Sequence, residues 1–215
     1  MKQFVVVGLG RFGLSVAKTL AENDYNVLAI DSDEEKVQSI ANDVTHAVEA
    51  DATDEDALRT LGVRNFDVAI VSIGDNIHAN ILATLILKEL GVKYVVVKAQ
   101  DTLHGKVLSK VGADRVVYPE RDMGMRIAHN LISSNVLDYI EFAPNYSVIE
   151  IIASETMIGK SLSELQLRSH FNVNVMAIKR GKELNITPGA NDKILEGDVL
   201  IVMGKNNDLD KVKAF

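Results

Sequence analysis

The chain has 215 residues, of which 47% are apolar, a formal net charge of -7 at pH 7 and no cysteine. This length and composition allow one large or two small globular domains. The acidic balance argues against nucleic-acid binding as the main function, because phosphate neutralisation requires a basic face. The lack of cysteine excludes disulfides and thiolate metal sites and fits a reducing compartment, so we expect a cytoplasmic protein. No apolar segment is long enough to cross a bilayer, so any role at a membrane requires a partner.

The first half of the chain alternates short apolar runs with segments of helical periodicity. The Val-rich run at 3–8 is typical of a strand that is buried on both faces of a parallel sheet. We expect further strands at 27–30, 44–50, 68–73, 94–98 and 115–118, and helices at 12–22, 33–42, 54–61, 76–90 and 102–111. This alternation predicts an α/β fold, a Rossmann-like doubly wound parallel sheet of six strands in the order 3-2-1-4-5-6.

Pro119 marks a change in the pattern. It opens a predicted helix that runs to about Asn135 and carries an apolar stripe of Met123, Ile127 and Leu131. A connection at 137–144 and a small α+β unit should follow, with strands at 147–152, 173–178 and 199–203 and a short helix at 161–167. We therefore expect a first domain at 1–120, a helix and linker at 121–140 and a second domain at 141–215.

A glycine-rich turn, residues 8–13, lies between the first predicted strand and helix, and Asp31 ends the second strand. Gly8 permits the tight turn, Gly10 lets the backbone approach a phosphate, and Gly13 allows close packing of helix on strand. The helix N-terminus would offer N–H groups to phosphates. Asp31 would accept hydrogen bonds from a ribose and disfavour the 2′-phosphate of NADP. The alternative is a tight turn with an empty cradle.

Several charged residues at the same rim of the sheet each have two interpretations. Arg11 can reach a phosphate or extend into solvent. Asp51 can accept a hydrogen bond from an adenine amino group, or it or Asp54 can cap a helix. Lys98, at the end of the fifth strand, can attract phosphate or be an ordinary edge lysine. Glu120 can complement the dipole of the helix that it opens, or meet phosphates through a divalent cation.

The sequence offers a nucleotide cradle without recognisable catalytic machinery. The five histidines show neither metal-ligand spacing nor a triad motif, and a dehydrogenase would need a catalytic acid or base in its second domain. We expect a nucleotide sensor, with an NAD-dependent oxidoreductase as the alternative. The candidate nucleotide-binding residues are Gly8, Gly10, Arg11, Phe12, Gly13, Asp31, Ser32, Asp51, Ala52, Thr53, Ile73, Gly74, Lys98 and Glu120, and Glu120 is also the candidate metal contact.

Taken together, these motifs resemble the family of regulators of potassium conductance, called RCK, KTN or TrkA proteins, in their Ktr type. The resemblance covers the whole chain. It rests on residues 8–13, Asp31 and the segments 49–53, 97–99 and 112–124 of a TrkA-N part, and on the segments 158–162, 175–180 and 195–200 of a TrkA-C part.

The resemblance implies a regulatory subunit that is not an enzyme. Its members form homo-oligomeric rings, commonly of eight subunits, that dock from the cytoplasm under an integral-membrane potassium-translocating subunit. ATP and ADP compete for the cleft, NAD(H) binds some relatives, and ATP favours the conducting state. By this resemblance Asp31 holds the ribose and Arg11 reaches the terminal phosphate. Glu120 approaches the phosphates from the neighbouring subunit through Mg²⁺ or Ca²⁺, and the helix from Asp122 to Asn135 exchanges between paired subunits.

The resemblance also implies a second ligand, cyclic di-AMP, in the C-terminal domain. Its pocket would be lined by Val173, Val175, Ile178, Lys179, Arg180, Asn185 and Ile186. The Lys-Arg pair would meet the phosphates, and the apolar residues would meet the purines. The alternative is an ordinary strand end with solvated charges.

Overall fold

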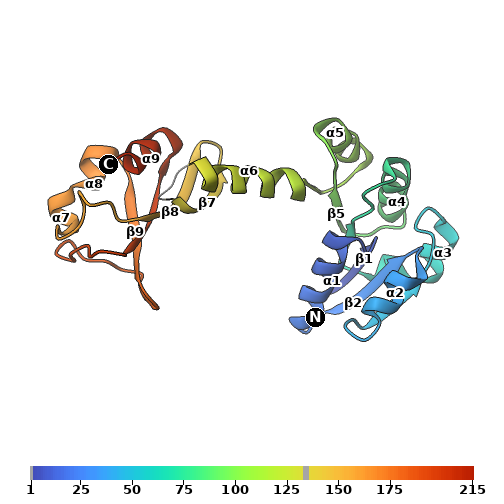
Figure 1. Ribbon diagram of the computed structural model, residues 1–215. Coiled ribbons are helices and arrows are strands. Elements are labelled where there is room, and N and C mark those ends of the chain that lie inside the picture. Colours follow the sequence, from blue (N-terminus) through green and yellow to red (C-terminus); the bar gives the residue numbers. More distant parts are fainter. Residues whose placement is uncertain (1, 133–135) are drawn as a thin grey trace. The chain divides into compact units, whose positions relative to one another are not determined.

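The computed structural model describes residues 2–132 and 136–215, which divide into two compact units at Pro119 and Glu120 (Figure 1). The first unit contains a parallel sheet in the order β3-β2-β1-β4-β5-β6, as the alternating sequence pattern predicts. Its elements are β1 (Gln3–Val7), α1 (Arg11–Glu22), β2 (Asn26–Asp31), α2 (Glu34–Ile40), β3 (His46–Glu49), α3 (Glu55–Thr60), a 3-10 turn (Val63–Asn65), β4 (Val68–Val71), α4 (Ile77–Glu89), β5 (Tyr94–Lys98), α5 (Thr102–Val111) and β6 (Arg115–Val117).

The sheet is buried on both faces, which explains the continuous apolar strands. Val5 and Val7 of β1 pack in one core cluster with residues of α3, α4 and α5. Val6, between them, points to the opposite cluster, which contains residues of α1 and α2. Since neighbouring side chains of a strand face opposite ways, a strand with helices on both sides must be apolar throughout.

Four of the five helices α1 to α5 begin at a residue whose side chain caps the helix. Asp33, Asp54, Asn76 and Asp101 each accept a backbone N–H bond of the helix that follows, as N-cap residues do. In contrast, α1 begins at Gly10, which provides no side-chain cap, and its first turn contains no acidic residue. The first N–H groups of α1 are therefore left without the usual side-chain acceptor.

The second unit has a five-stranded antiparallel sheet in the order β10-β9-β11-β8-β7. Its core includes Ile149, Ile151, Leu200 and Val202, all fully buried. The elements of this part of the chain are α6 (Pro119–Ile132), β7 (Val136–Ala143), β8 (Tyr146–Ile152), α7 (Leu162–Leu165), α8 (Leu167–Phe171), β9 (Asn174–Arg180), β10 (Glu183–Asn185), β11 (Val199–Lys205) and α9 (Asn206–Lys213).

The expectation of a plain connection at 137–144 is wrong, because this segment lies almost entirely in the strand β7. The strand pairs antiparallel with β8 across a tight turn in which Asn145 has a φ of 65°. Register shifts on both sides of its centre interrupt the alternation of buried and exposed residues, so the period-2 signal is weak. The expected end of the preceding helix, 133–135, lies outside the described residues.

Three further elements of the second unit were not expected from the sequence: α8, β10 and α9. Helix α9 is short and polar, but its Leu209 and Val212 are almost fully buried in the core of the second unit. Packing against this core stabilises the helix, and its eight residues are too few to show a clear apolar periodicity in the sequence. Strand β10 has only three residues, and all of them are exposed. It therefore lacks the alternation of apolar and polar residues by which a half-buried strand could be predicted.

Candidate functional site: a cleft at the carboxyl edge of the parallel sheet

A cavity of about 390 Å³ lies in the first unit, where the carboxyl ends of β1, β2 and β4 meet the loop after β3. Nine of the predicted nucleotide-binding residues line it: Gly8, Gly10, Asp31, Ser32, Asp51, Ala52, Thr53, Ile73 and Gly74. The cavity is also lined by residues that the sequence reasoning did not select as binding residues: Val7, Ile30, Lys36, Ala50, Ser72, Asp75, Asn76 and Ala79. Its place, where the strand order reverses between β1 and β4, is where doubly wound sheets bind ligands.

The three glycines of residues 8–13 have different steric roles. Gly8 has a φ of 90°, and a Cβ there would lie 2.9 Å from the Ile73 nitrogen. A Cβ on Gly13 would lie 1.9 Å from the Gly8 carbonyl oxygen, which is impossible without a shift of the backbone. A Cβ on Gly10 would meet no protein atom within 4 Å. Gly8 and Gly13 therefore shape the turn, whereas Gly10 keeps the mouth of the cavity open.

The start of α1 makes this part of the cavity electropositive. Gly10, which lines the cavity, is the N-terminal flanking residue of α1 and offers no side-chain acceptor to its N–H groups. The partial positive charge at a helix N-terminus and its unsatisfied N–H groups together favour an anion such as phosphate. Arg11 and Phe12, the next two residues, lie outside the cavity lining, and the Arg11 side chain is exposed.

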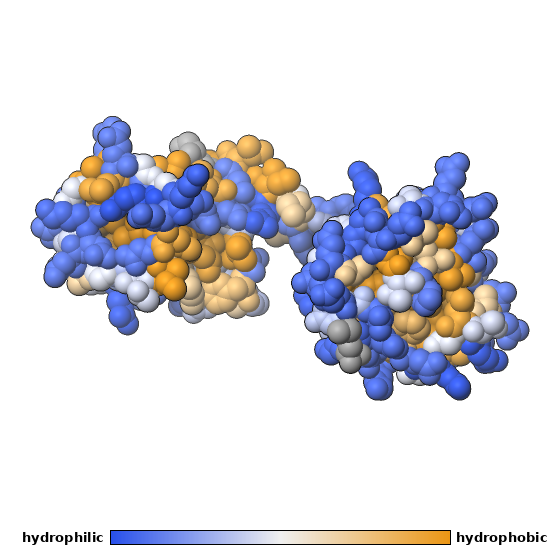
Figure 2. All heavy atoms as spheres, turned by 90° about the horizontal axis from the view of Figure 1, so that it is seen from below, coloured by the Kyte–Doolittle hydropathy of each residue, from blue (hydrophilic) through white to orange (hydrophobic). Residues whose placement is uncertain are grey.

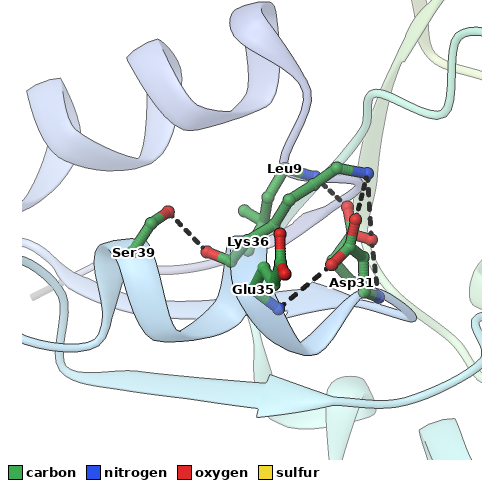
Figure 3. A network of polar contacts seen from close by, with 6 residues as sticks. Leu9, Asp31, Glu35, Lys36 and Ser39 are labelled. Atoms are coloured by element: carbon green, nitrogen blue, oxygen red, sulfur yellow. Dashed lines mark hydrogen bonds and ion pairs between the residues drawn. The ribbon is translucent and has the colours of Figure 1, made fainter.

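Asp31 is held in place from two sides (Figure 3). Its Oδ2 accepts a hydrogen bond from the Leu9 N–H at 2.6 Å, and its Oδ1 accepts one from the Asp33 N–H at 3.0 Å. Its side chain is only 10% exposed. Asp31 thus ties the glycine turn to the loop after β2 and keeps the remaining lone pairs of the carboxylate in a fixed orientation.

Lys36 is a residue of the cavity that sequence reasoning missed. Its Nζ lies 3.6 Å from the Asp31 Oδ1 and 3.4 Å from the Asp33 Oδ2. Although partial burial acts in the opposite direction, the Asp31 and Asp33 carboxylates raise the pKa of Lys36, so its ammonium stays charged. A signal was present in the sequence, because Lys36 follows the helix cap Asp33 by three residues and so lies on the same side of α2.

The loop after β3 contains both of the acidic residues that were considered as helix caps. Asp54 caps α3 by accepting from the Asp56 and Ala57 N–H groups. Asp51 instead accepts from the backbone N–H and the hydroxyl of Thr53, at 2.8 and 2.7 Å, and these bonds lower its pKa. Asp51 therefore remains an ionised, exposed acceptor on the cavity wall.

Two side-chain amides, one buried and one exposed, connect the loops that follow β4 and β5. The side-chain amide of Asn80, which is fully buried, donates to the carbonyls of Ile73 at 2.6 Å and Lys98 at 3.2 Å. The Gln100 amide donates to the Gly74 carbonyl. Lys98 lies outside the cavity lining, but its Nζ would be 3.7 Å from a Cβ on Gly74, which places the ammonium beside this wall.

Among residues 2–132 and 136–215, no three His, Cys, Asp or Glu side chains gather in a group that could hold a metal ion. Glu120 lies in the first turn of α6 together with Asp122, where carboxylates complement the helix dipole. A cation bound at Glu120 would therefore need ligands other than a cluster of protein carboxylates or histidines, for example phosphate oxygens.

The seven residues predicted to bind a second ligand do not line one cavity. Ile178, Arg180 and Asn185 line a hollow of about 240 Å³ in the second unit. Val173 and Val175 line another, of about 230 Å³, with residues of α7 and α8. Lys179 and Ile186 line neither of these two hollows, and Ile186 is 69% exposed.

Arg180 also has a structural partner within the second unit. Its Nε and Nη2 donate to the two carboxylate oxygens of Asp198 at 2.8 and 2.7 Å. Asp198 is fully buried, and it also accepts from the Leu195 N–H at 2.9 Å. The paired hydrogen bonds from Arg180 lower the pKa of Asp198, so this carboxylate stays ionised inside the unit.

Comparison with known proteins matches the TrkA-N domain family to residues 4–119 and the TrkA-C domain family to residues 147–215. The chain belongs to this family of RCK proteins. This RCK chain is 52% identical over 210 residues to the Ktr system potassium uptake protein C of Bacillus subtilis, with 98% of this chain and 95% of that protein covered. The match confirms the family resemblance that the motifs indicated.

Solved structures give the same fold. The RCK chain resembles the GsuK RCK domain with a TM-score of 0.69 and 17% identity, over 99% of this chain and 47% of that one. It resembles GsuK bound to ADP with a TM-score of 0.52 and 28% identity, over 61% of this chain and 34% of that one. The chain thus spans less than half the length of either solved chain. No helix in the described part of the RCK chain has the length and apolar character needed to span a membrane.

Proposed function

We propose that this chain is a nucleotide-sensing regulatory subunit of a potassium uptake system, binds ATP and ADP in the cleft of its first unit, and is not an enzyme. The observation that carries the proposal is the cleft itself, where the uncapped start of α1 and the anchored Asp31 carboxylate line one cavity. These two groups suit the opposite ends of a nucleotide, its phosphates and its ribose. The similarity to a Ktr system potassium uptake protein supports the role in potassium transport.

The nucleotide would lie along the carboxyl edge of the sheet. Its ribose would meet Asp31, its adenine the wall formed by residues 51–53, and its phosphates the turn of residues 8–13. Arg11 and Lys98 are the cations proposed for the terminal phosphates, and Glu120 would act from a neighbouring subunit through Mg²⁺ or Ca²⁺. The likeness of this chain to GsuK bound to ADP, at 28% identity over 61% of the chain, supports this class of ligand.

Homo-oligomer formation is supported by α6. Its large apolar side chains at Met123, Met125, Ile127, Leu131 and Ile132 are between 49% and 80% exposed in the single chain. Figure 2 shows hydrophobic residues gathered over this helix and neighbouring parts of the second unit. A second copy of the chain would remove these apolar side chains from water, and this burial would stabilise the pair of subunits. We propose paired subunits that exchange α6 and assemble into a ring of eight.

The proposed ring acts on the cytoplasmic side of the membrane, docked on an integral-membrane potassium-translocating subunit. Its output would be a change in how subunits meet. Such gating requires that ATP and ADP bind two arrangements of the ring with different affinities, because a ligand with equal affinity for both shifts neither.

Cyclic di-AMP remains the proposed second ligand of the C-terminal part. Three of its seven predicted residues line one hollow, which supports a small polar site there. Arg180 would have to meet a phosphate while it stays paired with Asp198, using the outward side of its half-exposed guanidinium.

A calorimetric titration of the purified chain with ATP, ADP, NADH and cyclic di-AMP tests the proposal. We expect saturable binding of ATP and ADP to the first unit, with mutual competition. If NADH binds far more tightly than ATP and is oxidised when a small carbonyl compound is added, the chain is an oxidoreductase and the regulatory function is wrong. A chain that stays monomeric with and without ATP would contradict the ring.

A further inference from the structure

The ribose end of the cleft contains a cation as well as an acid. Lys36 lines the cavity beside Asp31, and its side chain is 46% exposed, so a ligand can reach it. Both of its carboxylate neighbours lie at 3.4 to 3.6 Å from Nζ. These separations are longer than the 2.7–2.9 Å typical of a charge-assisted N–H···O bond, so the ammonium can turn a donor toward a ligand without breaking a short bond.

The Asp31 carboxylate is positioned to bind the same ligand group as the Lys36 ammonium. The Leu9 and Asp33 N–H groups each occupy a lone pair of Asp31 and prevent its rotation. Asp31 and Lys36 both line the cavity, and the Lys36 ammonium lies beside the Asp31 carboxylate (Figure 3). A hydroxyl group is both a donor and an acceptor, so one hydroxyl can donate to the carboxylate and accept from the ammonium at the same time.

We infer that Lys36 is a specificity-determining residue of the nucleotide cleft, which selects a free ribose 2′-hydroxyl by donating a hydrogen bond to its oxygen while Asp31 accepts a hydrogen bond from its O–H. This inference rests on the function proposed above and assigns one contact within it. A 2′-deoxyribose would leave both side chains without their shared partner. A 2′-phosphate would still be repelled, because Asp31 and Asp33 together outnumber the single charge of Lys36.

The test compares ATP with 2′-deoxyATP by calorimetry on the wild-type chain and on Lys36→Met, which keeps the length of the stem but removes the charge. The wild type should prefer ATP by about tenfold, the size of effect that a hydrogen bond to a charged group gives. In Lys36→Met this preference should fall to about threefold or less, with the ratio of ATP to ADP affinity unchanged, since the proposed contact of Lys36 is with the ribose, which ATP and ADP share. Lys36→Arg, which retains a donor, should restore most of the preference for ATP.

Lys18→Met is the matched control, because Lys18 is similarly exposed and pairs with Asp43 at 2.7 Å outside the cavity lining. It should leave the preference for ATP unchanged. Equal losses of ATP and 2′-deoxyATP affinity in Lys36→Met would overturn the inference and leave the nucleotide-sensing function intact. Failure of the wild type to bind ATP, ADP and NADH would overturn both.

Discussion

Alanine substitutions at two glycines of the same turn should have opposite consequences. Gly13→Ala places a Cβ 1.9 Å from the Gly8 carbonyl oxygen, so α1 must move away from the turn. Overpacking typically costs 1–3 kcal/mol, and because the contact here is with rigid backbone we expect about 3 kcal/mol. For a unit of this size, that corresponds to a fall in Tm of about 10 °C. Differential scanning calorimetry of the chain without nucleotide measures it.

Gly10→Ala is the comparison that makes the reasoning testable. Its backbone, with a φ of -66°, accepts alanine, and the new methyl meets no protein atom within 4 Å. Stability should change by less than about 1 kcal/mol. The methyl would instead fill the space where phosphate approaches the backbone, so ATP affinity should fall about tenfold or more. The reasoning is refuted if Gly10→Ala loses as much stability as Gly13→Ala, or if it binds ATP as the wild type does.

Two other predictions concern buried polar contacts. Asp198→Ala should cost the second unit about 1–2 kcal/mol, because it removes the hydrogen bonds that this carboxylate accepts from Arg180 and Leu195 while the half-exposed Arg180 can be solvated, and chemical denaturation followed by circular dichroism measures this. Since Arg180 lowers the pKa of Asp198, their contribution to stability is complete above about pH 4, the carboxyl pKa of the unfolded chain, and is lost as pH falls through the lower folded value. If the free energy of unfolding of Asp198→Ala fell with acidification as steeply as that of the wild type, this reasoning would be wrong. Asn80→Leu should cost about 1–3 kcal/mol by leaving the Ile73 and Lys98 carbonyls unsatisfied, and amide exchange in residues 73–76 should become faster; unchanged exchange would show that Asn80 does not hold this rim.

The parallel sheet could be predicted because its signals are local and agree with one another. The four central strands are short apolar runs, most helices begin at an Asp or Asn cap, and the order of strands agrees with right-handed crossovers. Most of the cleft was predictable for the same reason, since residues at the carboxyl ends of neighbouring parallel strands must meet.

The parts that could not be predicted depend on side-chain and strand contacts that local periodicity does not report. Strand β7 is visible only through its pairing with β8, and α9 only through the burial of Leu209 and Val212. Lys36 looks like an ordinary solvated lysine until α2 places it beside Asp31. Arg180 reads as a solvated charge until the fold places Asp198, eighteen residues later, against it.

The most direct test of the nucleotide-sensing account is small-angle X-ray scattering of the assembled chain at saturating ATP and at saturating ADP, with binding verified by titration in the same buffer. The account predicts two different scattering profiles at equal mass, because the two nucleotides favour different arrangements of the same subunits. Identical profiles with both nucleotides bound would contradict it.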